Sequence, residues 1–82
     1  MADQQPWSDW IVADPEILGG KPAIRGTRIS VEFVLELLAS GAAPAEILQQ
    51  YPHVPADGLA AALRFAADVL KGEHVWTLRV PA

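Results

Sequence analysis

The chain has 82 residues, no cysteine and a formal net charge of −4. A chain of this length forms one domain, and neither a disulfide nor a cysteine-ligated zinc ion can stabilise it. The acidic balance argues against a strong DNA- or RNA-binding surface and fits a partner that is itself basic, such as a nuclease. No segment reaches the roughly 18–20 apolar residues of a membrane span, and the polar start is unlike a signal peptide. We therefore expect a cytoplasmic protein without membrane contact.

Hydrophobic residues make up 51% of the chain, which is more than the thin core of a small domain needs. The surplus predicts that some apolar surface faces a partner, and the simplest partner is a second copy of the chain. We therefore expect a homodimer.

The first part of the chain contains short extended segments between turn signals. Residues 1–9 are polar and are expected to form a flexible N-terminal arm. Residues 10–13 form a short strand candidate that ends at an Asp-Pro turn, and residues 23–25 and 27–30 could be two further strands. These segments predict a small hairpin.

Residues 14–28 are rich in glycine, proline and cations, and they form either a rigid hairpin or a binding loop. They contain Lys21, Arg25 and Arg28, half of the six basic residues. These cations could contact nucleic-acid phosphates, or the two arginines could pair with the acidic side chains Asp14, Glu16 and Glu32 and lock the hairpin. A nucleotide-binding P-loop is not indicated, because proline follows the lysine and the full motif is missing.

The pattern then changes to the period of a helix. Apolar residues from Val31 to Leu38 recur at helical spacing, with Ser30 as a good N-cap and Gly41 as a stop. Apolar side chains cover more than half of this helix, so it should pack on two sides. A second helix is expected between prolines 44 and 52, and a third over residues 56–71.

Three helices with short links are typical of a helix-turn-helix. The sequence therefore predicts an α+β, mainly α fold: short N-terminal strands and a three-helix bundle over residues 10–72, followed by an extended arm, residues 73–82. The third helix would be the reading helix, but its polar face is poor in base-reading residues. Arg64 is a tentative nucleic-acid contact, and Asp68 is expected to offset its charge one turn away.

The C-terminal arm alternates in an extended pattern, which places Trp76, Leu78 and Val80 on one side. A strand of this kind either completes its own domain, packs on a second copy or adds to a partner. These three residues are the candidate partner-binding residues. Trp76 is the expected anchor, because buried aromatics dominate interface energetics.

Catalytic chemistry is not indicated. His53 and His74 lack further ligands at a metal-binding spacing, and a domain of this size seldom builds a cleft with groups of perturbed pKa. We expect no enzyme activity, no metal, no cofactor and no small-molecule substrate.

The sequence resembles the domain of unknown function 433. The resemblance covers about residues 10–69 and rests on a specific G-G-x-P-x-I-x-G-T-R signature and a later Tyr-Pro-His, which lie in these segments: Gly19–Ile24, Gly26–Ile29 and Tyr51–His53. Two positions depart from the family pattern, because Ala43 and Pro55 stand where the family often has a Ser or Thr helix cap.

The resemblance implies a prokaryotic protein with a homeodomain-like helix-turn-helix. It also implies a VapB-type antitoxin that neutralises a PIN-like ribonuclease toxin and can autoregulate its operon by binding operator DNA. The acidic charge and the apolar C-terminal arm agree with that expectation. The alternatives are a DNA-binding repressor, or a structural module without a toxin.

Overall fold

The computed structural model describes residues 5–72, and its N-terminal part is a two-stranded antiparallel hairpin. Strand β1 (Ile11–Val12) pairs with β2 (Ala23–Ile24), with Ile11 opposite Ile24. A 3-10 turn, η1 (Leu18–Gly20), lies between them. The predicted strand over residues 27–30 is reduced to one bridge between Ala23 and Ser30, because Ser30 already caps the following helix.

Three helices follow the hairpin, as the sequence predicts: α1 (Val31–Ala39), α2 (Pro44–Gln50) and α3 (Ala56–Gly72). The Ser30 hydroxyl accepts a 2.9 Å hydrogen bond from the Phe33 amide and so begins α1. Ala43 has no capping side chain, but Glu46 Oε1 accepts a 2.7 Å bond from the Ala43 amide and satisfies one free donor. The α+β, mainly α fold class is confirmed.

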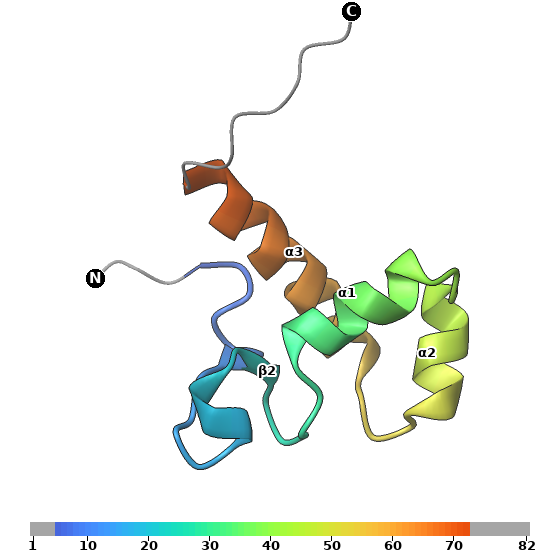
Figure 1. Cartoon of the computed structure of the whole chain (residues 1–82), viewed down its shortest axis with the longest axis horizontal. Helices are drawn as coiled ribbons and strands as arrows, with labels where there is room; N and C mark the ends of the chain where they lie inside the picture. The colour runs from blue at the N-terminus through green and yellow to red at the C-terminus, as the bar shows by residue number, and fades with distance from the viewer. Residues whose placement is uncertain (1–4, 73–82) are drawn as a thin grey trace, which may run out of the picture.

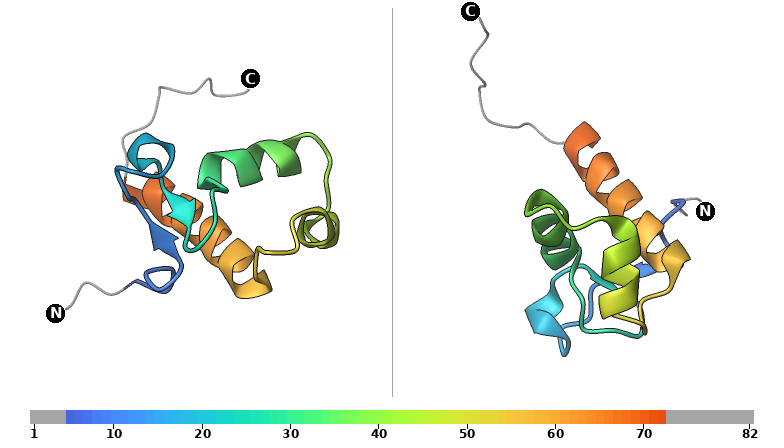
Figure 2. Two further views of the ribbon diagram at one scale, coloured as in Figure 1. Left: turned by 90° about the horizontal axis from the view of Figure 1, so that it is seen from below. Right: turned by 90° about the vertical axis from the view of Figure 1, so that its right-hand side faces the viewer.

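The longest helix, α3, joins the other elements into one domain (Figures 1 and 2). It packs against α1, β1 and β2. The core is formed by these buried apolar residues: Ile11, Ala23, Ile24, Val31, Val34, Ile47, Val54, Leu59, Ala61 and Ala62. They come from all three helices, both strands and the turn before α3, so the hairpin is part of the core.

Gly58 marks the closest approach between α3 and the hairpin. It is buried, and a Cβ atom at this position would lie 2.9 Å from Cγ2 of Ile24, a side chain with no exposed surface. Real Cβ contacts of that length essentially do not occur. A glycine therefore allows the N-terminal part of α3 to lie directly on β2.

Trp7, in the expected N-terminal arm, packs on the domain. Trp7 lies against Phe65 of α3 in an edge-on arrangement, with 4.7 Å between ring centroids. The Trp7 side chain is half-buried, and a turn over residues 5–10 positions it. Trp7 is thus held in place where a loose arm is expected, because its ring supplies both apolar area and a hydrogen-bond donor. Residues 1–4 of that arm lie outside the described residues. No helix in residues 5–72 is long and apolar enough to cross a membrane.

Candidate functional site

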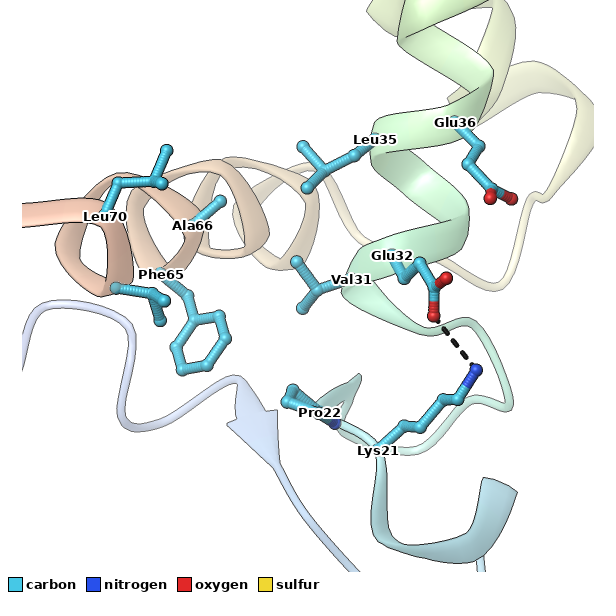
Figure 3. Close-up of a pocket in the computed structure, with 10 residues that line it drawn as sticks. Lys21, Pro22, Val31, Glu32, Leu35, Glu36, Phe65, Ala66 and Leu70 are labelled. Carbon is cyan, nitrogen blue, oxygen red and sulfur yellow. Dashed lines mark hydrogen bonds and ion pairs between the residues drawn. The ribbon is translucent and has the colours of Figure 1, made fainter. Parts of the chain in front are cut away.

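An apolar groove lies between α1 and the C-terminal half of α3 (Figure 3). Its volume is about 470 Å³. We call it the α1–α3 groove, and it is lined by these residues: Lys21, Pro22, Val31, Glu32, Leu35, Glu36, Phe65, Ala66, Val69 and Leu70. Figure 3 shows Leu35 and Val31 of α1 facing Ala66 and Leu70 of α3, with the small Ala66 side chain between larger neighbours.

The apolar side chains of this groove are left open to solvent. Leu35 is 39% exposed, Val69 43% and Leu70 64%. Sequence periodicity placed Leu35 and Leu70 on the core stripes of their helices, but the structure places both at the groove. The first turns of α3 are buried against the rest of the domain, whereas its last turns extend beyond the other elements (Figure 1). Apolar side chains near the end of α3 are therefore left exposed. Adjacent exposed apolar side chains of this size typically mark a binding surface.

An ion pair forms the polar rim of the groove. Lys21 Nζ donates a 2.9 Å hydrogen bond to Glu32 Oε1, and the two side chains are about 60% exposed. This hydrogen bond and then the negative charge of Glu32 raise the pKa of Lys21 above its ordinary value of 10.5. Glu36 lies one turn further along α1 and makes no ion pair with any residue from 5 to 72.

The signature loop, residues 19–29, supports this rim through a compact turn. The Thr27 hydroxyl is buried, donates a 2.8 Å bond to the Ile24 carbonyl and accepts a 3.0 Å bond from the Ile29 amide. Gly26 supplies the positive φ of +80° that the turn requires. The Pro22 carbonyl accepts a bond from the Val31 amide, which ties the loop to the start of α1. The hairpin interpretation of the signature is therefore confirmed.

The predicted lock between arginines and acids is not present among residues 5–72. Arg25 and Arg28 are exposed, and neither forms a salt bridge within the described part of the chain. The cation that pairs with Glu32 is Lys21 instead, because the hydrogen bond from the Val31 amide to the Pro22 carbonyl holds the residue next to Lys21 at the start of α1. The two arginines flank the exposed Gly26 and present their charges to solvent.

Arg64 lies apart from these cations, in a smaller hollow on α3 that Trp10 and Asp57 also line. The expected pairing of Arg64 with Asp68 is not observed in residues 5–72. Asp68 accepts a 2.7 Å bond from the Trp7 indole and lies 3.8 Å from Lys71 Nζ. The four tentative nucleic-acid contacts are thus not gathered on one element.

The predicted partner-binding residues Trp76, Leu78 and Val80 lie outside the described residues. His53, in the turn before α3, is exposed. From residue 5 to residue 72, no three His, Asp or Glu side chains are grouped closely enough to hold a metal ion.

Sequence reasoning did not identify the α1–α3 groove as a site. Phe65 and Val69 are four residues apart, so they share a face of α3 beside the predicted stripe. That second apolar face is the sequence signal that could have indicated the groove. The sequence does not show whether this face lies in the core or at a groove, because apolar residues at helical spacing indicate burial without saying what covers them.

Comparison with known proteins gives a family but no described activity. Residues 11–66 match the family "Protein of unknown function (DUF433)". The chain is 35% identical over 65 residues, or 78% of its length, to "Uncharacterized protein y4eO" of Sinorhizobium fredii (strain NBRC 101917 / NGR234). It spans only 29% of the length of that relative. No solved structure matches it. The matched residues include the signature loop and α1, and the chain belongs to the DUF433 family.

Proposed function

We propose that this protein is a non-catalytic antitoxin that binds and neutralises a PIN-like ribonuclease. The observation that carries the proposal is the α1–α3 groove, which is apolar and lies beside the last turns of α3. Residues 73–82 continue from that helix with three large apolar side chains at alternate positions. A groove and an adjacent apolar segment together form a surface suited to protein binding.

The charge of the chain also supports a basic protein partner. The net charge is −4, and Glu32 and Glu36 lie at the groove. A nuclease carries cations for its RNA substrate, so complementary charge would steer the two proteins together. In this proposal Trp76, Leu78 and Val80 contact the ribonuclease, and Trp76 is the anchor because aromatic side chains dominate interface energetics.

The first test is whether the source genome encodes a PIN-like ribonuclease beside this protein, and the second test uses that enzyme. RNA cleavage is measured with the ribonuclease alone, with the full chain, and with the full chain carrying Trp76→Ala, Leu78→Ala and Val80→Ala. We expect the native chain to block cleavage and the triple variant to lose most of that inhibition. Leu63→Ala, a change at another partly exposed leucine, is the control and should inhibit as the native chain does.

Full inhibition by the triple variant would show that residues 73–82 do not contribute to binding the ribonuclease. A source genome without a neighbouring PIN-like ribonuclease would instead favour a structural module without a toxin.

A homodimer belongs to the same proposal, because two copies would present two groove surfaces related by a two-fold axis.

Operator DNA binding is a second candidate function, and the exposed pair Arg25 and Arg28 favours it. Neither guanidinium is held by an acid within residues 5–72, so both are available to phosphate groups. Helices α2 and α3, joined by residues 51–55, would form the helix-turn-helix. Arg64 on α3 and Lys21 before β2 would be minor contacts. The acidic chain predicts weak affinity that falls as the salt concentration rises.

Binding to DNA upstream of the gene is measured at several salt concentrations. We expect Arg25→Ala with Arg28→Ala to abolish it, and Arg64→Ala to have a smaller effect. Undiminished binding by the double variant would place the DNA surface elsewhere on the protein.

A further inference from the structure

We infer that, in the free protein, residues 73–82 of the same chain occupy the α1–α3 groove, with Trp76 seated over Ala66. This inference does not depend on the toxin, because it concerns the protein alone. It identifies the occupant of a groove whose apolar lining is otherwise left in water.

The end of α3 brings these residues to the groove. Val69 and Leu70 line it, and α3 ends at Gly72, so the following residues begin within one turn of the groove. A helix rises about 1.5 Å per residue, which places Ala66 about 9 Å before Gly72 along the axis. Four extended residues, 73–76, span about 13 Å, so the chain can reverse direction and bring Trp76 level with Ala66.

The shape of the groove suits an aromatic ring at that position. Ala66 is the smallest side chain of the lining, and Figure 3 shows it between Leu35 on one side and Phe65 on the other. A small residue between large ones leaves a depression that a ring can fill. Burying a tryptophan against such neighbours removes roughly 150–250 Å² of aromatic surface from water.

Charge fixes the direction in which the segment lies. Figure 3 shows Glu32 and Glu36 on the side of the groove away from Leu70. Lys21 already pairs with Glu32, and Glu36 has no ion-pair partner in the part of the chain that the structure describes. Arg79 is the one arginine of residues 73–82. Residues 77–79 add about 10 Å beyond Trp76, which takes Arg79 toward Glu36.

An intramolecular occupant is favoured over one from a second copy by effective concentration. A segment joined directly to the end of the groove is present at a local concentration of about millimolar. A second copy reaches that level only at millimolar protein. The segment of the same chain therefore fills the groove first in dilute solution.

The first test labels the full chain with 5-fluorotryptophan and follows its ¹⁹F NMR signals. Trp7, Trp10 and Trp76 give three resonances, and Trp76→Phe identifies the third. We expect the Trp76 signal to differ from its random-coil position in the native chain and to return to it in Leu35→Lys. The matched control is Leu63→Lys, because Leu63 and Leu35 are 37% and 39% exposed and Leu63 does not line the groove.

The Trp7 and Trp10 signals report whether each variant is folded. A Trp76 signal at the random-coil position in the native chain would overturn the inference. So would an equal effect of the two lysine substitutions. A native signal that changes with protein concentration would instead assign the groove to a second copy.

The second test uses the absence of natural cysteine. Glu36→Cys with Arg79→Cys is oxidised in the full chain, and Arg64→Cys with Arg79→Cys is the control, since Arg64 lies outside the groove. We expect the groove pair to form an intramolecular disulfide at least about tenfold faster than the control pair, because docking raises the local concentration of the two thiols. Equal rates, or a covalent dimer as the main product, would contradict the inference.

Discussion

The Trp7 indole donates a 2.7 Å hydrogen bond to the Asp68 carboxylate across 61 residues of sequence. The same ring packs edge-on against Phe65, which is also a lining residue of the α1–α3 groove. Trp7 therefore contacts a residue that lines the groove. The N-terminal residues and the C-terminal half of α3 are held together by this contact.

Trp7→Phe should lower the free energy of unfolding by about 1 kcal/mol, because it removes a hydrogen bond to a charged acceptor that is partly solvated. The phenyl ring retains most of the contact with Phe65. The measurement is urea denaturation. Asp68→Asn keeps an acceptor oxygen and should lower the free energy of unfolding by less than Trp7→Phe does. In a double-mutant cycle with Asp68→Ala the two effects should not add, and additive effects would mean that the bond contributes nothing to stability.

Thr27→Val should destabilise the protein by about 1–3 kcal/mol, because it leaves the buried Ile24 carbonyl and Ile29 amide without the hydroxyl. Thr27→Ser keeps the hydroxyl and loses only one methyl group, which corresponds to about 0.8 kcal/mol. Thermal unfolding of the three proteins compares the two changes. If serine destabilises as much as valine, the hydroxyl does not hold the signature turn.

Gly58→Ala should destabilise the protein although alanine is the better helix former. The gain in helix propensity is about 1 kcal/mol. Overpacking against the buried Ile24 side chain costs about 1–3 kcal/mol, so we expect a net loss of about 1 kcal/mol. Gly72→Ala is the control, because no atom lies within 4 Å of a Cβ there and its effect should be neutral or favourable. Chemical denaturation distinguishes the two, and a stabilised Gly58→Ala protein would show that the helix–hairpin contact is loose.

Lys21 should titrate above pH 10.5, because Glu32 favours its charged form. A raised folded pKa means that the pair stabilises the fold below pH 10.5 and that this stabilisation is lost as the pH rises through the folded value. Both groups are exposed, so the effect on stability should be small and weakened by salt. NMR titration of the Lys21 ε-carbon should show a lower pKa in Glu32→Gln and no change in Glu46→Gln. The same pKa in all three proteins would contradict the pair.

The sequence by itself determined the secondary-structure elements of this protein. Ser30 at the start of α1, Pro44 at the start of α2 and the spacing of apolar residues predict all three helices, because caps and helical periodicity are local properties. The glycines and prolines of residues 14–28 likewise predict the hairpin turn, since φ preferences act on single residues.

Only the tertiary structure decided which apolar surfaces are covered. Leu59 and Leu70 belong to the same predicted stripe of α3, yet Leu59 is 4% exposed and Leu70 64%, because the hairpin and α1 cover only the first part of the helix. The partners of Asp68 and Glu32 also depend on the fold, since Trp7 and Lys21 reach them from distant positions in the chain. Periodicity fixes the face on which a side chain lies, and the docking of other elements decides whether that face becomes a core or a groove.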